Sequence, residues 1–250
     1  MPVMFGLCQD DGLILSAPFL QTRDRCVQCV QCVQCVQCVH YRWLLLRTDW
    51  TSWAPLLFFG RERELTSHTD REAAEDIGRF YFGEDTDISS LSSEDGTIRQ
   101  LTRMFSMSYF FSAAHQDSRL LAQAGADVHA FVLARPPAFT LMDLFRLSLG
   151  QLCWMFTARS FGYNPYPHQY GVCHGDDINY LFPMEPPGFP PAVVTEEQLQ
   201  VQSHLLDIVS SYAADGETRN IRDVGGVWQP LQVSQSQRRR LTLSYLIISL

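Results

Sequence analysis

A histidine between two glycines is the first feature of this sequence that could do chemistry. Residues 171–175 read Gly-Val-Cys-His-Gly, with His174 near the centre. Because glycine carries no side chain, a histidine placed in such a segment can approach a substrate closely. Imidazole gains and loses a proton near neutral pH, which suits general acid–base chemistry. A lone histidine is more often structural, so the surrounding residues must decide its role.

The residues around His174 form a recognisable pattern. Segment 171–182, GVCHGDDINYLF, resembles the histidine loop of the type-B carboxylesterases, the cholinesterase-like branch of the α/β-hydrolases. The resemblance implies a serine esterase with a Ser–Asp/Glu–His triad, in which His174 is the general base. The expected partner is a small lipophilic ester.

Other segments resemble the same family. Residues 3–12 are similar to the strand and turn that carry the family's catalytic acid, usually Glu followed by Gly. The resemblance assigns that role to Asp11, since either carboxylate can orient an imidazole. The likeness covers almost the whole chain but only the C-terminal half of the family's domain. Segments similar to the family's middle helix, the strand before the histidine loop and the C-terminal end are 70–83, 128–133, 228–230 and 245–247.

The serine that this family needs is missing from the sequence. None of the 15 glycines begins Gly-x-Ser-x-Gly, and no His-Gly-Gly segment is present to form an oxyanion hole. In this fold the serine precedes the acid, so we expect it upstream of Met1. The nearest pattern, Arg-Leu-Ser-Leu-Gly around Ser148, lacks the first glycine. We therefore expect this chain alone to be inactive.

Cys173 offers a competing pattern, Gly-x-Cys-x-Gly, a thiol version of the nucleophile elbow. An elbow follows a strand and opens a helix, whereas residues 163–170 contain two prolines and cannot form a buried strand. We interpret Cys173 as a small packing residue. Asp176 and Asp177 are expected to fix the loop by hydrogen bonds. Aromatic residues in 161–170 could line an acyl or alcohol pocket or belong to the core.

Five of the eight cysteines lie in a repeating Cys-Val-Gln tract from Cys26 to Cys38. Repeated C-x-x-C spacing superficially matches an iron–sulfur or zinc site. Metal ligands must converge, however, and this tract has no turn residue. A perfect triplet repeat is also what a short tandem repeat in DNA encodes. We interpret residues 21–41 as a low-complexity insert in one partial domain spanning 1–250, and expect no metal or other cofactor.

The composition excludes several classes of protein. The net charge of -8, from 19 basic and 27 acidic residues, makes nucleic acid a poor partner. All the basic residues are arginine, which excludes pyridoxal phosphate enzymes, Schiff-base aldolases, P-loop proteins and protein kinases. No apolar stretch reaches the roughly 20 residues of a membrane-spanning helix. The N-terminus lacks a signal-peptide pattern, so the compartment stays open, as does the oligomeric state.

The elements that must position these residues alternate between strand and helix, which indicates an α/β fold. Predicted strands are 2–7, 128–133 and 241–248, and predicted helices are 13–20, 70–82, 98–124 and 195–214. Asp70 is a predicted N-cap, 84–96 a predicted loop, and Thr195 with Gln198 a predicted capping box. Three strands are too few for the length of the chain. We therefore expect the C-terminal part of an α/β-hydrolase fold, with an incomplete sheet and long loops.

Two other hypotheses compete with the esterase fragment. Cholinesterase-like adhesion or binding proteins keep the fold without the triad, and need not retain both Asp11 and His174. The residue at the upstream elbow would separate the two, since an esterase needs serine there. The repeat also suggests a broken or mis-assembled gene product with no activity.

Overall fold

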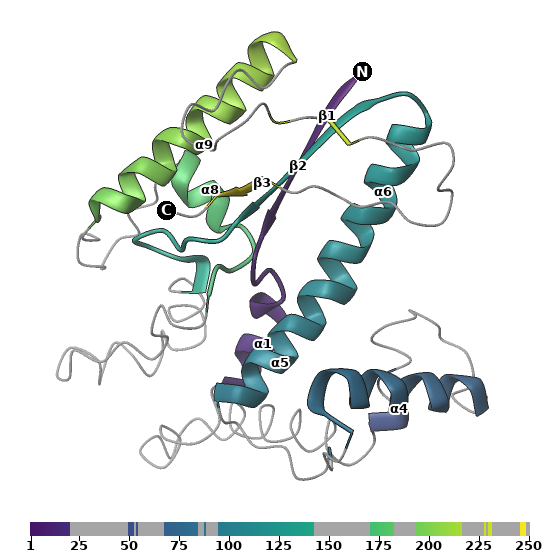
Figure 1. Cartoon of the computed structure of the whole chain (residues 1–250). Coiled ribbons are helices and arrows are strands. Elements are labelled where there is room, and N and C mark those ends of the chain that lie inside the picture. The colour runs from purple at the N-terminus through teal and green to yellow at the C-terminus, as the bar shows by residue number, and fades with distance from the viewer. Residues whose placement is uncertain are drawn as a thin grey trace, which may run out of the picture. The chain divides into compact units, whose positions relative to one another are not determined.

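The computed structural model describes about half of the chain (Figure 1). The predicted cysteine repeat, Ser148 and the aromatic segment 161–170 lie outside the described part. The chain divides into two compact units: one consists of Met1–Asp11, Phe110–Leu149 and Asn164–Leu250, and the other of Gly12–Tyr109 and Gly150–Tyr163. The described residues are 1–20, 50–52, 54, 68–84, 88, 95–142, 171–182, 194–216, 228, 230–231 and 246–248.

A small, open parallel sheet forms the centre of the first unit. Its strands are β1 (Pro2–Cys8), β2 (Asp127–Leu133) and β3 (Leu246–Ile248), in that order across the sheet. Cys8 pairs with Leu133, which in turn pairs with Ile248, so the strands end together at one edge. The three predicted strands and the mixed helix-and-strand class are confirmed. For the predicted strand 241–248, only the part that forms β3 is described.

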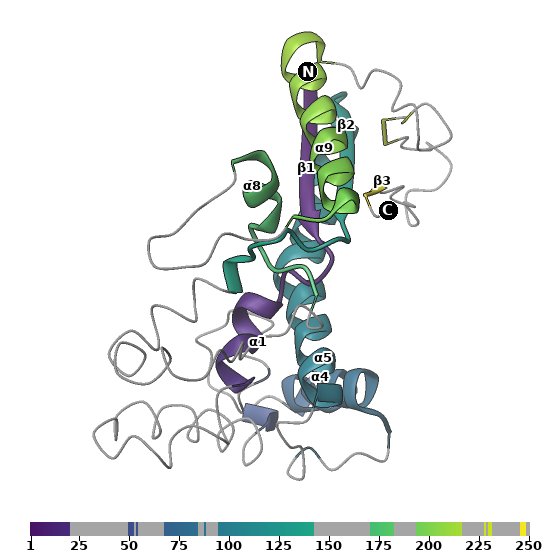
Figure 2. The ribbon, with the colours of Figure 1, turned by 90° about the vertical axis from the view of Figure 1, so that its left-hand side faces the viewer.

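Helices cover both faces of this sheet, because the side chains of β1 and β2 point alternately to opposite sides. On one face, Leu7 and Val132 pack against Ala114 of α6 (Ser112–Gln123). The other face carries α9 (Glu196–Asp215), which runs along β1 and β2 in Figure 2. Figure 1 shows α6 and α9 on either side of the strands. The core beneath α9 includes Cys8, Phe131, Leu133, Val201, Leu205, Ile208 and Ile248.

The predicted capping box at the start of α9 is confirmed. Thr195 Oγ1 accepts the backbone N–H of Gln198 at 3.2 Å, and Gln198 Oε1 accepts that of Thr195 at 2.9 Å. These two bonds satisfy amides that a helix start otherwise leaves unpaired. A short helix that the sequence did not predict, α8 (Asp176–Leu181), directly follows His174 and Gly175.

The second unit contains α1 (Leu13–Leu20), α4 (His68–Phe82) and α5 (Asp95–Phe105). The predicted N-cap at Asp70 is wrong, because α4 begins two residues earlier and Asp70 lies in its first turn. The N-cap and the first turn both favour an acidic side chain, since each lies at the positive end of the helix dipole. The predicted loop 84–96 is also too long, because α5 begins at Asp95.

The predicted helix 98–124 is three elements in succession. A π-helix, Ser106–Phe111, connects α5 to α6. Such wide turns are uncommon and have no clear pattern in sequence. Among the described residues, no helix is both long enough and apolar enough to cross a membrane.

Candidate active site

Asp11 lies in the turn that follows β1, at the edge where the parallel strands end. Its Oδ2 accepts the backbone N–H of Cys8 at 3.0 Å, and its own N–H donates to the Cys8 carbonyl at 3.2 Å. The side chain is only 2% exposed. This turn therefore holds a buried carboxylate in a fixed orientation, at the edge of the sheet where open α/β folds bind ligands.

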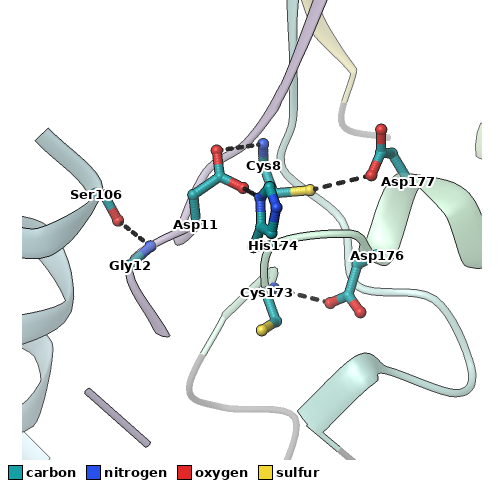
Figure 3. A network of polar contacts seen from close by, with 8 residues as sticks. All are labelled: Cys8, Asp11, Gly12, Ser106, Cys173, His174, Asp176 and Asp177. Atoms are coloured by element: carbon teal, nitrogen blue, oxygen red, sulfur yellow. Dashed lines mark hydrogen bonds and ion pairs between the residues drawn. The ribbon is translucent and has the colours of Figure 1, made fainter. Parts of the chain in front are cut away.

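His174 meets this carboxylate from a distant part of the sequence (Figure 3). Its Nδ1 lies 3.0 Å from Asp11 Oδ1. The imidazole is 51% exposed, in contrast to its buried partner. When Nδ1 carries the proton it donates to Asp11, which leaves Nε2 as a proton acceptor. Among the described residues, Asp11 is the hydrogen-bond partner of His174.

The backbone around His174 is anchored on both sides. Val172 and Cys173 are buried. Asp176 Oδ2 accepts the Cys173 N–H at 2.8 Å, and its Oδ1 accepts the N–H of Leu141 at 2.7 Å. The prediction that Asp176 fixes the loop by hydrogen bonds is thus confirmed, while Asp177 accepts a longer contact of 3.8 Å from the Cys8 thiol.

A second aspartate of the turn, Asp10, also holds this segment. Its backbone N–H donates to the Val172 carbonyl at 3.0 Å, and its Oδ2 accepts the Val172 N–H at 3.1 Å. Neighbouring aspartates therefore contact the histidine segment in two ways. Asp10 binds its backbone, and Asp11 binds the His174 ring.

An aromatic ring covers one side of the His174 imidazole. Phe110 lies with its centroid 4.7 Å from that of His174, and the two planes are tilted by 38°. Phe110 belongs to the π-helix Ser106–Phe111. Functional sites often use such helices to place a side chain. Sequence reasoning did not find Phe110, since the register of a π-helix departs from the helical repeat, and it did not find Asp10, because adjacent acids resemble an ordinary turn.

Gly12, the residue after Asp11, is required by close packing within the second unit. Its N–H donates to Ser106 Oγ at 2.9 Å (Figure 3). A Cβ on Gly12 would overlap the backbone of residues 102 and 106. The order of an acid followed by glycine therefore has a physical reason. Position 11 needs a carboxylate to contact His174, and position 12 has no room for a side chain.

Burial dominates the electrostatics of Asp11. It raises the pKa of the carboxyl to about 6, although the hydrogen bonds from His174 and from the Cys8 backbone act in the opposite direction. At neutral pH the group is mostly ionised, and it can accept a hydrogen bond from Nδ1–H. The contact therefore places a negative charge behind the ring, where it stabilises an imidazolium.

The two cysteines of the site are buried and poorly suited to be nucleophiles. Burial raises the pKa of the Cys173 thiol far above its usual range, and nearby Asp176 adds to this effect. Burial also raises the pKa of the Cys8 thiol, and the charges of Asp177 and Asp11 add to this effect. Figure 3 shows the Cys173 sulfur pointing away from the Asp11–His174 pair. Since the thiolate is the reactive form, Cys173 fits the predicted packing role.

No three histidine, cysteine, aspartate or glutamate side chains within the described ranges are grouped to hold a metal ion. Comparison with models of protein families found no match to this chain. Comparison with curated proteins likewise found no significant match. The case for function therefore depends on the residues and geometry described above.

Proposed function

We propose that this chain supplies the acid and the histidine of a serine carboxylic ester hydrolase, as the C-terminal part of an α/β-hydrolase domain of the type-B carboxylesterase kind. The observation that carries the proposal is the 3.0 Å contact between Asp11 Oδ1 and His174 Nδ1. The two residues are 163 positions apart, yet they meet at the carboxyl edge of a parallel sheet. Burying a carboxylate is costly, so a buried carboxylate paired with a half-exposed imidazole at this edge supports a functional role.

Each residue has a distinct role in the proposed reaction. Asp11 holds the Nδ1–H tautomer, so that Nε2 of His174 faces the substrate side. Nε2 takes the serine proton as the hydroxyl attacks the ester carbonyl, and returns it to the departing alcohol. In the second half of the reaction, water attacks the acyl-serine with the same help from Nε2, which releases the carboxylic acid product and restores the serine. Asp11 stays ionised and stabilises the imidazolium in both halves.

The serine and most of the oxyanion hole must come from sequence outside this chain, because no Gly-x-Ser-x-Gly occurs in it. The proposed substrate is a small lipophilic ester. Its acyl and alcohol pockets would draw on the missing half as well. The alternative of a cholinesterase-like binding protein is less well supported, since binding requires neither the Asp11–His174 contact nor an accessible imidazole.

The transcript provides the first test. Its 5′ end should be sequenced through the Cys-Val-Gln tract, and the longest product should be expressed beside the 250-residue chain. We expect an upstream Gly-x-Ser-x-Gly and hydrolysis of p-nitrophenyl butyrate by the long product only. If the upstream residue at the elbow is not serine, or if the long product with serine is inactive on short esters, the proposal fails.

A further inference from the structure

We propose that Asp10 is a positioning residue. By hydrogen bonding to the backbone of Val172, two residues before His174, it holds the His174 ring against Asp11. The role of the positioned ring in proton transfer rests on the proposed function. The hydrogen bonds between Asp10 and Val172 are themselves a structural observation. They involve the Asp10 backbone and carboxylate, the backbone of buried Val172, and the neighbouring Gly171.

The first observation is that Asp10 forms hydrogen bonds with both backbone polar groups of a single buried residue, Val172. Its N–H donates to the Val172 carbonyl at 3.0 Å, and its Oδ2 accepts the Val172 N–H at 3.1 Å. Val172 is only 1% exposed, so these groups cannot turn to water instead. Leaving a buried amide unpaired is costly, and this makes the pairing a strong positional constraint.

The second observation is that Gly171 makes room for this carboxylate. Its backbone has φ +115°, a conformation that other residues rarely adopt, and a Cβ there would overlap the Asp10 carboxylate. Gly171 and Asp10 therefore form a fitted pair. Alanine at position 171 would displace Oδ2 from the Val172 amide without any change to Asp10 itself.

The third observation is that few bonds separate the Asp10–Val172 hydrogen bonds from the His174 imidazole. Asp10 is bonded to Asp11, and Val172 is separated from His174 by Cys173 alone. The adjacent residues Asp10 and Asp11 thus bind the backbone at Val172 and the imidazole of His174, respectively. If the Val172 end moves away, the 3.0 Å contact between Asp11 Oδ1 and His174 Nδ1 must lengthen. Asp176 accepts the Cys173 N–H and so holds the segment at the next residue along the chain.

The test measures the His174 Nδ1 proton directly in the full 250-residue chain, labelled with ¹⁵N-histidine. The signal is assigned by its loss in His174→Ala, and its exchange rate with water is compared among four variants. Asp10→Ala and Gly171→Ala should speed exchange at least about tenfold, since each frees the Val172 amide. Asp10→Asn retains an acceptor oxygen and should stay within about twofold of the original rate. Asp207→Ala removes an exposed acid of α9 and is the matched control for lost charge.

Each outcome decides the proposal. A merely structural Asp10 predicts lower stability in Asp10→Ala with unchanged Nδ1 exchange in the folded protein, and this result would overturn the inference. Equal rates in Asp10→Asn and Asp10→Ala would also overturn it. If Asp10→Ala does not fold, Gly171→Ala and Asp10→Asn still decide by the difference between them. These signals do not depend on ester hydrolysis, so failure of the proposed function would appear separately, as an inactive long product with a normal Nδ1 signal.

Discussion

Two histidines of the first unit lie in opposite surroundings. His174 is half exposed at the edge of the sheet and contacts a buried carboxylate. His129 is buried in the middle of β2, between Tyr212 of α9 at 5.6 Å and Trp228 at 5.1 Å between ring centroids. Burial lowers the pKa of His129, and its Nδ1 has no hydrogen-bond partner among the described residues.

The difference shows what makes a histidine chemically useful. Both rings have aromatic neighbours, so aromatic company does not distinguish them. Of these two histidines, His174 is the one that combines a charged partner on one ring nitrogen with access to solvent. His129 fills space in a core, where burial disfavours the charged form of its ring.

The largest expected effect separates the two histidines by activity. In the long product that contains the serine, His174→Ala should lower kcat by about 10,000-fold or more, because the general base is lost. His129→Phe should leave kcat within about threefold, since it replaces one buried ring by another of similar size. Initial rates on p-nitrophenyl butyrate measure both. Comparable losses in the two variants would contradict the assignment.

Asp11→Asn should harm activity and yet help stability. The folded-state pKa of about 6 lies above the usual 3.8, so the native protein holds a proton that the unfolded chain loses first. Asp11 therefore lowers the free energy of unfolding as the pH rises from about 4 to about 6, by up to about 3 kcal/mol. Urea unfolding of the 250-residue chain at several pH values should show that Asp11→Asn lacks this decrease. An unchanged pH dependence would mean that the carboxylate is not strained by burial.

His129→Phe should change the pH dependence in the opposite sense. Since the pKa of His129 is lowered, the unfolded chain binds a proton that the folded protein excludes. The stability that His129 provides is therefore present above its unfolded pKa and is lost as the pH falls. The same urea titrations should find a shallower acid loss in His129→Phe, with a change of less than about 1.5 kcal/mol at about pH 8. An acid loss as steep as in the original chain would show that His129 is not the excluded group.

The smallest effect concerns the cysteine beside His174. Cys173→Ala removes a buried sulfur and should cost about 1 kcal/mol of stability, with kcat of the long product within about threefold. A loss approaching that of His174→Ala would restore Cys173 as a nucleophile. Cys8→Ala is the matched control, because Cys8 is equally buried and is the last residue of β1, at the same edge of the sheet.

Local patterns predicted most of the elements. Short apolar runs predicted the three strands, and Thr195 with Gln198 predicted the start of α9 to within one residue. These features depend on neighbours in sequence, which is why they could be found. The π-helix at Ser106–Phe111 and the short helix after His174 depend on tertiary contacts, and no local pattern indicates them.

The site was only partly predictable for the same reason. The resemblance to the carboxylesterase family predicts His174 and Asp11 from residues 171–182 and 3–12. Neither spacing nor composition shows that the two meet. Sequence patterns did not indicate Phe110 and Asp10, because their importance lies in what they contact. Phe110 contacts the His174 ring, and Asp10 binds the backbone of buried Val172.

The central claim is that Asp11 and His174 activate a serine, and covalent labelling tests it most directly. The long product should be treated with a fluorophosphonate, which reacts with activated serines, and the modified residue located by mass spectrometry. The account predicts a label on the serine of an upstream Gly-x-Ser-x-Gly, with labelling slowed by about 1,000-fold or more in His174→Ala and in Asp11→Asn. Equal labelling of the three proteins, or no label on that serine, would contradict it.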